Sequence, residues 1–217
     1  MKNIILSIWL CASLSLAANA QTQSGNFFLG GNINWDNSEN ETNDVNSSAL
    51  GLRTNEQNTL NAQTTIGTFV RDNLVLGLLV NYDNRKEESY YSENNSYSLY
   101  KTKGISVGPF VRKFFPLSEK FSFYTQGNVG YGRSSNRQTS GSINQRNSSR
   151  SENNSFVAAL KPGLVYFATN KFGLDLSVQG LQYAAGKEKD SDNSFSRFDA
   201  GFNLPNLTIG LNLYLGR

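Results

Sequence analysis

Side chains that could carry chemistry are few in this chain of 217 residues. It contains no histidine, and its single cysteine is Cys11. Most enzymatic serine and cysteine nucleophiles need a histidine base, and zinc sites are built largely from cysteine and histidine. A lone cysteine also cannot form an internal disulfide. The sequence therefore indicates no catalytic residue, no metal site and no cofactor site, and a carboxylate-only or Ser–Lys mechanism has no obvious residues to support it.

A glycine cluster is formed by Gly127, Gly130 and Gly132. Glycine-rich loops bind phosphate when a helix follows directly, because the helix N-terminus supplies backbone N–H groups and a positive dipole end. The residues after Gly132 are polar and show no helical pattern. We interpret the cluster as small residues where a β-structure is crowded, and not as an anion-binding loop.

Three charged residues, Arg112, Lys161 and Asp175, lie in segments that are otherwise almost uncharged. Lys161 and Asp175 flank one short turn, so they could meet diagonally across a hairpin. If they line a pore, they could form a selectivity filter. If the interior is narrow, they should instead pair and fill it. We expect the second arrangement, a candidate lumen network of salt bridges.

Two polar stretches carry opposite charge. Residues 36–58 contain five acidic residues and one arginine, whereas the stretch from 133 to 154 contains four arginines and one acid, Glu152. Arginine binds phosphate and carboxylate groups through paired hydrogen bonds, so the second stretch is a candidate anion-contacting loop. An ordinary solvated loop, or pairing between neighbouring loops, is the alternative. The four arginines are Arg133, Arg137, Arg146 and Arg150.

The elements that must position these residues alternate between apolar and polar side chains. Such period-two patterning is typical of β-strands of about ten residues. In 74–82, for example, Leu74, Leu76, Leu78 and Val80 lie on one face. Residues 198–204 are in the opposite phase to those after them, which a bulge near Pro205 would reconcile. The predicted strands are 26–35, 60–70, 74–82, 104–112, 121–132, 156–167, 172–179 and 206–215.

The connections also alternate in length. Short turns are expected at 71–73, 116–119 and 168–170, and long polar loops at 36–58, 83–100, 134–154 and 184–197. Short and long connections therefore lie at opposite ends of an eight-stranded antiparallel up-and-down arrangement. Only the direction in which the apolar face points distinguishes a soluble barrel from a membrane-spanning one.

Three features favour the membrane. The polar faces are rich in Asn, Gln, Ser, Thr and Gly but poor in charge, which suits a lumen better than a water-exposed surface. Long and short connections segregate. Aromatic residues gather at the strand ends, as they do where strands meet lipid headgroups. They are Trp35, Tyr82, Tyr100 and Tyr131 at one end, and Phe114, Phe115, Phe121, Phe167 and Phe172 at the other.

The first twenty residues resemble a secretory signal peptide. Lys2 precedes an apolar stretch from Ile4 to Leu16, and Ala18-Asn19-Ala20 matches the small residues at a cleavage site. A mainly apolar stretch of thirteen residues is too short to cross a bilayer of about 30 Å as a helix. We therefore expect residues 1–20 to be removed after Ala20, leaving a single barrel domain at 21–217.

Residues 25–217 resemble the small eight-stranded outer-membrane β-barrels of the OmpX and OmpA-barrel type, including "porin family" proteins of Gram-negative bacteria. The resemblance rests on the hairpin Ile66–Leu74, the segments Gly108–Arg112 and Pro162–Phe167, and the C-terminal pattern Thr208-x-Gly210-x-x-Leu213-x-Leu215. The C-terminal pattern is similar to the signal read by the barrel-assembly machinery, although it lacks the usual terminal aromatic residue.

The resemblance implies a monomeric protein of the outer membrane, in contact with membrane lipids and lipopolysaccharide. We expect a filled lumen and four polar loops outside the cell that act in a structural or adhesive role, with an extracellular glycan or protein as a possible ligand. A porin-like channel for small solutes is the alternative, and a soluble periplasmic barrel is a further one. Barrel enzymes of the outer membrane use a histidine, so we expect no enzyme. The net charge of +3 is too small to indicate nucleic-acid binding.

Overall fold

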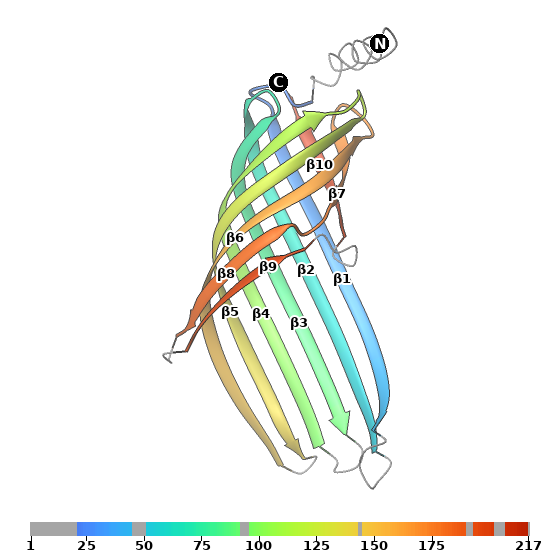
Figure 1. Ribbon diagram of the computed structural model, residues 1–217, viewed down its shortest axis with the longest axis vertical. Helices are drawn as coiled ribbons and strands as arrows, with labels where there is room; N and C mark the ends of the chain where they lie inside the picture. Colours follow the sequence, from blue (N-terminus) through green and yellow to red (C-terminus); the bar gives the residue numbers. More distant parts are fainter. Residues whose placement is uncertain are drawn as a thin grey trace, which may run out of the picture.

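A computed structural model describes residues 21–44, 51–91, 96–142, 145–189, 193–201 and 207–216. The predicted signal peptide, its cleavage site and the expected bulge near Pro205 lie outside these residues. Within them the chain is all-β, and none of their secondary structure is a helix that could span a bilayer. The strands lie side by side in a tall, twisted barrel (Figure 1).

The first six strands of the described chain are much longer than predicted at one end. They are β1 (Phe27–Asp44), β2 (Gly51–Arg71), β3 (Leu74–Tyr91), β4 (Ser96–Pro116), β5 (Phe121–Ser142), β6 (Gln145–Phe167), β7 (Phe172–Ser177), β8 (Leu181–Glu188), β9 (Ser194–Ala200) and β10 (Thr208–Leu215).

Eight of these strands form a closed ring in the order β1-β2-β3-β4-β5-β6-β7-β10, and every pairing is antiparallel. The ring closes where Phe27–Asn32 of β1 pair with Gly210–Leu215 of β10. The eight-stranded up-and-down barrel predicted from the sequence is therefore confirmed. Closure satisfies the backbone N–H and C=O groups of the strands without water.

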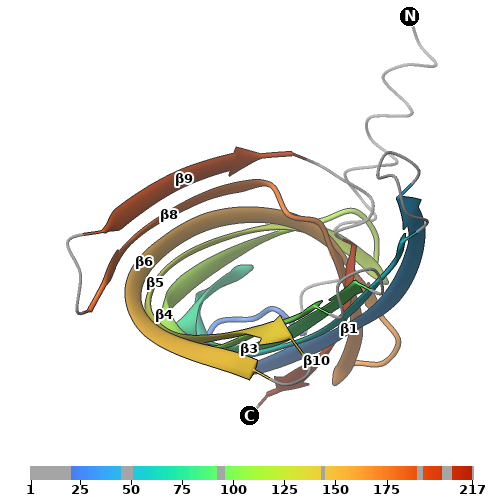
Figure 2. The ribbon, with the colours of Figure 1, turned by 90° about the horizontal axis from the view of Figure 1, so that it is seen from below.

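The seventh strand is interrupted. One part of β6, Gly163–Phe167, pairs with β7, while Asn153–Leu160 pair with β8. Past the break, β8 and β9 form a hairpin that lies outside the ring (Figure 2). The barrel thus has two halves, which we call the ring half, with the short turns, and the far half, with the long hairpins.

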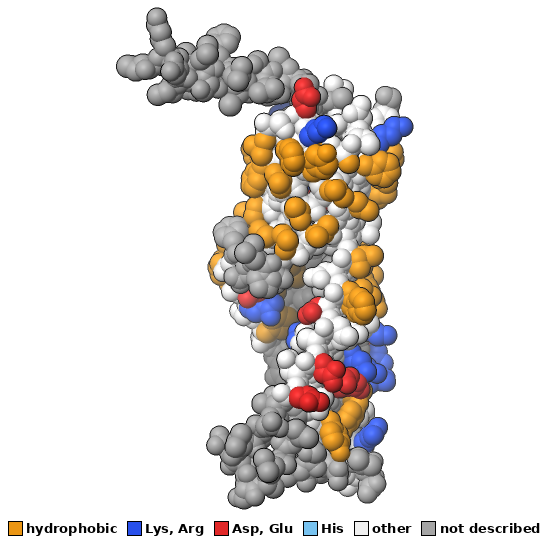
Figure 3. Space-filling model, turned by 90° about the vertical axis from the view of Figure 1, so that its right-hand side faces the viewer, with side chains coloured by type: hydrophobic (Ala, Val, Ile, Leu, Met, Phe, Trp, Pro, Cys, Tyr) orange, Lys and Arg blue, Asp and Glu red, His pale blue; other side chains and the backbone are white. Residues whose placement is uncertain are grey.

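The apolar faces point outward, as the membrane interpretation requires. Strand β3 illustrates this alternation. Leu76 and Leu78 are exposed on its outer face, whereas Val75 and Leu79 on its inner face are buried inside the barrel. Hydrophobic side chains gather on the part of the wall nearest the C-terminus (Figure 3). Trp35, Tyr82 and Tyr131 are exposed at the far-half edge of this band, which we call the far aromatic girdle.

Three aromatic residues expected at the strand ends do not belong to the outer girdles. Phe114 and Phe167 are buried in the lumen, because their strand positions have inward parity. Tyr100 is partly buried and lies opposite Gln138, on the inward face of β4. Phe115, Phe121 and Phe172 are exposed at the ring-half edge, as expected.

The prediction of long polar loops is wrong for most of the described residues in these connections. Most of the described residues in these connections continue the β-ladders, which run to the pairs Asp44 with Gly51, Tyr91 with Ser96, and Ser142 with Gln145. Proline would interrupt such a ladder because it has no backbone N–H to donate. None is present in 36–58, 83–100 or 134–154, so backbone pairing can continue through these segments. The far half is therefore built from extended hairpins rather than from irregular loops.

Candidate functional site

Buried aromatic side chains form a cluster inside the ring half. Phe28 lies among four rings, with centroid distances of 6.4 Å to Phe69, 6.3 Å to Phe110, 6.4 Å to Phe114 and 5.6 Å to Tyr214. These five residues are each at most 3% exposed. An interior of eight strands is just wide enough to be filled in this way, so the ring half holds a packed core.

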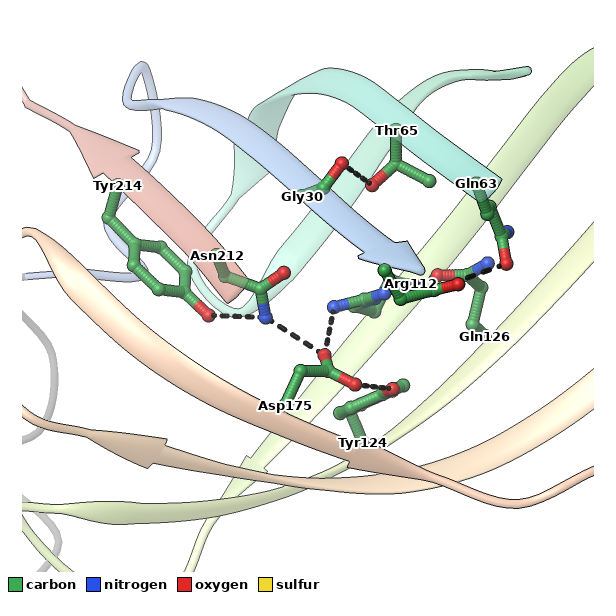
Figure 4. A network of polar contacts seen from close by, with 10 residues as sticks. Gly30, Gln63, Thr65, Arg112, Tyr124, Gln126, Asp175, Asn212 and Tyr214 are labelled. Carbon is green, nitrogen blue, oxygen red and sulfur yellow. Dashed lines mark hydrogen bonds and ion pairs between the residues drawn. The ribbon is translucent and has the colours of Figure 1, made fainter. Parts of the chain in front are cut away.

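A buried ion pair lies directly against this core (Figure 4). Arg112 on β4 donates from Nη1 to Asp175 Oδ2 on β7 at 2.9 Å, and both residues are 6% exposed. The guanidinium also donates from Nε to Gln126 Oε1 at 2.8 Å and lies 4.1 Å from the ring centroid of Tyr124. Cation–π contact compensates part of the cost of burying the guanidinium.

The Asp175 carboxylate is fully satisfied. The Tyr124 hydroxyl donates to Oδ1 at 2.7 Å, and Asn212 Nδ2 donates to Oδ2 at 2.8 Å, beside the bond from Arg112. Because these residues lie on β4, β5, β7 and β10, one hydrogen-bonded network crosses the lumen. We call the residues Arg112, Tyr124, Gln126, Asp175 and Asn212 the lumen floor.

The pairing of Lys161 with Asp175 that we expected does not form in the described residues, where the ion-pair partner of Asp175 is Arg112. Register gives the reason: Asp175 lies opposite Val165, four residues along β6 from Lys161. The side chain of Tyr124 packs over Gly163, between these two positions, and its hydroxyl occupies one carboxylate oxygen. The structure thus brings Arg112 and Asp175 together and leaves Lys161 apart.

Lys161 instead lines two cavities above the floor. The smaller has a volume of about 20 Å³, room for about one water molecule, and includes Arg112 and Asp175 in its wall. The larger, about 630 Å³, lies within the far half and is lined mainly by amide, hydroxyl and glycine residues. Lys161 therefore lies between the lumen floor and the larger cavity.

The glycine cluster forms no anion-binding loop. Gly127, Gly130 and Gly132 all lie inside strand β5, which continues to Ser142. A Cβ on Gly132 would come within 2.8 Å of Ser106 Cβ and 3.0 Å of a backbone oxygen of Ile105. Crowding on the strand, as the sequence indicated, explains a small residue at this position.

The four arginines of the predicted anion-contacting loop lie on strands, and all four point outward. Arg133 and Arg137 are on β5, and Arg146 and Arg150 on β6, and the two arginines of each strand are four residues apart on its outer face. Arg133 and Arg150 both pair with Glu152, the latter at 3.2 Å. Arg146 lies 5.0 Å from the ring centroid of Tyr97.

Two lysines that the sequence analysis did not select lie on the same outer face. Lys86 faces Lys101 across β3 and β4, and Lys101 faces Arg137 across β4 and β5. Lys86 donates to Glu88 at 2.6 Å, and this hydrogen bond lowers the pKa of Glu88 below its ordinary value of 4.5. The pKa of Glu152 is lowered in the same way by its hydrogen bond from Arg133. The sequence signal that could have identified them is charge repeated two residues apart, Lys86 with Glu88 and Lys101 with Lys103.

The chain matches the sequence model of one protein family and, at low sequence identity, several solved structures. The sequence model of the family described as "Outer membrane protein beta-barrel domain" matches residues 7–205. No curated protein sequence matches the chain. Among solved structures, the attachment invasion locus protein Ail of Yersinia pestis is 14% identical, with a TM-score of 0.41 over 89% of this chain and 100% of its own.

Two further solved structures are similarly distant. Ail in complex with the heparin analogue sucrose octasulfate is 15% identical, with a TM-score of 0.42, and the match covers 89% of this chain and 100% of that one. Neisserial surface protein A is 15% identical, with a TM-score of 0.41, and the match covers 88% and 97% of the two chains.

Proposed function

Since the chain belongs to the outer membrane protein β-barrel domain family, we propose that it is an integral outer-membrane protein whose lumen is closed and whose long hairpins form a surface for interaction outside the cell. In this placement the short turns of the ring half face the periplasm. The far half rises from the outer leaflet as a stiff β-structure rather than as mobile loops.

The lumen floor is the observation that carries the closed state. Its five side chains join four strands, and the aromatic core lies against it. A continuous water path needs every layer of the lumen to be open, so one filled layer is sufficient to stop conduction. The absence of histidine from the whole sequence also favours a binding or structural role over catalysis.

A channel for small solutes is the second candidate function, and the cavity of about 630 Å³ in the far half favours it. That cavity would conduct only if the floor opened. We therefore propose that the cavity is a recess that ends at Arg112 and Asp175.

Conductance in planar lipid bilayers distinguishes the two functions. The purified full chain should insert without steady single-channel openings. The matched variant Tyr124→Ala removes the largest floor side chain, so it should show more frequent openings than the parent protein. Large, steady openings of the parent protein, unchanged in Tyr124→Ala, would support the channel instead.

We also propose how the protein is exported and assembled, and in which oligomeric state it acts. The signal peptide at 1–20 should be removed after Ala20, and the C-terminal pattern ending at Leu215 should be read by the barrel-assembly machinery. The protein is proposed to act as a monomer in contact with membrane lipids and lipopolysaccharide, with a glycan or protein as its external ligand.

A further inference from the structure

Four cationic side chains form one row across the outer face of the far half. Lys86 of β3 lies opposite Lys101 of β4, Lys101 opposite Arg137 of β5, and Arg137 opposite Arg150 of β6. Neighbouring strands are about 4.8 Å apart, so the row spans about 14 Å. We call these four residues the cationic row.

Such a row is unfavourable for an isolated sheet, because like charges directly opposite each other destabilise strand pairing. Its two ends are partly neutralised, Lys86 by Glu88 at 2.6 Å and Arg150 by Glu152 at 3.2 Å. Within the described residues, the central Lys101 and Arg137 make no ion pair, and both are exposed. A ligand that supplies negative charge would remove this repulsion.

Charge is sorted between the two flanks of the barrel. On the next row outward, Glu39 of β1 lies opposite Glu56 of β2, and Glu56 opposite Glu88 of β3. Beyond the far aromatic girdle, the charged residues described on the outer face of β1 and β2 are therefore acidic, whereas the outer face of β3 to β6 carries seven cations and only two acidic residues, Glu88 and Glu152. The outward cations of β3 to β6 there are Lys86, Lys101, Lys103, Arg133, Arg137, Arg146 and Arg150.

The inward face of the same strands does not share this charge. Beyond the girdle its only charged residues in the described parts of β3 to β6 are Asp83, Arg85 and Glu87, and the last two pair with each other. A solvated surface of random composition would not concentrate cations on one face and one flank. The cationic row thus points to a polyanion that approaches the barrel wall from the side.

The distance of the cationic row from the far aromatic girdle indicates which kind of polyanion it can reach. Lys86 is four residues beyond Tyr82, and Arg137 is six residues beyond Tyr131. At about 3.3 Å per residue and a strand tilt of about 40°, these positions lie roughly 10–15 Å above the girdle. Outward side chains at this height face the headgroups of neighbouring outer-leaflet lipids.

We propose that the cationic row is a binding site for the phosphate groups of lipopolysaccharide, and that the lipid binds on the β3–β6 flank and not on the acidic β1–β2 flank. The inference rests on the proposed outer-membrane placement. Arginine can bind a phosphate through two parallel hydrogen bonds, and lysine binds it as a point charge. The lipid shell around the barrel is therefore asymmetric.

The test compares thermal unfolding in nanodiscs of phosphatidylcholine, lipopolysaccharide and enzymatically dephosphorylated lipopolysaccharide. The row variant combines Lys86→Gln, Lys101→Gln, Arg137→Gln and Arg150→Gln. The matched control variant removes four exposed cations of the ring half instead, by Arg71→Gln, Lys113→Gln, Lys120→Gln and Lys171→Gln.

The row substitutions are expected to change the unfolding temperature in different ways in the two lipids. Lipopolysaccharide should raise the unfolding temperature of the parent and control proteins above the value in phosphatidylcholine, and the row variant should lose most of this rise. In phosphatidylcholine the row variant should unfold at the same or a higher temperature than the parent, since repulsion is relieved. Dephosphorylated lipopolysaccharide should give the parent little rise, and high salt should weaken the effect.

Other outcomes would overturn the inference. An equal rise for parent and row variant, or for phosphorylated and dephosphorylated lipid, would show that the row does not bind phosphate. A larger rise with soluble heparin in phosphatidylcholine discs would identify an external glycan as the ligand instead. Failure of the parent protein to insert into any disc would contradict the proposed function itself, and this outcome is distinguishable by the gel mobility of the unheated protein.

Discussion

At the scale of residues, the lumen floor is centred on the Asp175 carboxylate, both of whose oxygens accept hydrogen bonds. Sequence alternation placed Arg112, Lys161 and Asp175 on the lumen face, which the structure shows as well. It could not decide which cation meets Asp175, because that depends on the path of Tyr124 over Gly163. Contacts between strands that are not neighbours in sequence, such as β4 and β7, leave no signature in a single sequence.

Arg112 and Lys161 should differ in how much each contributes to the stability of the folded protein. Arg112→Met should destabilise the protein by about 3–5 kcal/mol, because removal of one partner leaves the buried Asp175 carboxylate uncompensated. Lys161→Met is the matched control and should cost less than about 1 kcal/mol, since Lys161 makes no ion pair in the described part of the chain. Equilibrium unfolding by urea in lipid vesicles measures both, and equal costs would show that Lys161 shares the carboxylate.

At the scale of elements, alternation predicted the strands well where one face is apolar and poorly beyond the girdle. Predicted 74–82 became Leu74–Tyr91, and predicted 26–35 became Phe27–Asp44. In the extensions both faces are polar, so hydrophobic period-two patterning disappears although backbone pairing continues. There, the remaining signal is that charged residues such as Arg133 and Arg137 lie at positions of the same parity.

The facing of β3 can be tested with one substitution on each face. Leu78→Arg places a charge on the lipid side, where Leu78 is 54% exposed, and should cost about 2–4 kcal/mol near the bilayer midplane. Asn81→Arg is the matched control, because Asn81 lines the wide cavity of the far half, and it should cost less. Folding equilibria in vesicles give both values. The opposite ranking would mean that the apolar face of β3 does not meet lipid.

At the scale of the whole molecule, the two halves of the barrel differ in how they are closed. In the ring half, β1 pairs with both β2 and β10. Beyond Asn32, the described part of β1 pairs only with β2, and β9 pairs only with β8. The eight strands of the ring were predictable from eight alternating segments. The break between β7 and β8 was not, because Val178-Gln179-Gly180 contains no residue that forbids a strand.

The closure of the ring between β1 and β10 can be tested with an engineered disulfide. Gly31 lies opposite Leu211, and directly paired residues have Cα atoms about 4.5–5.5 Å apart, within the range of a disulfide. A Cβ at Gly31 would have its nearest neighbour at 3.6 Å, so cysteine fits there. Gly31→Cys with Leu211→Cys should therefore cross-link on oxidation of the folded protein, and boiled samples should differ in gel mobility with and without reductant. In the control, Gly31→Cys is combined with Leu174→Cys, one strand further on, and should not cross-link. Because Cys11 is the only native cysteine and lies in the segment expected to be removed, no other disulfide competes. A cross-link in the control alone would place β7, and not β10, beside β1 and would rule out the ring order described above.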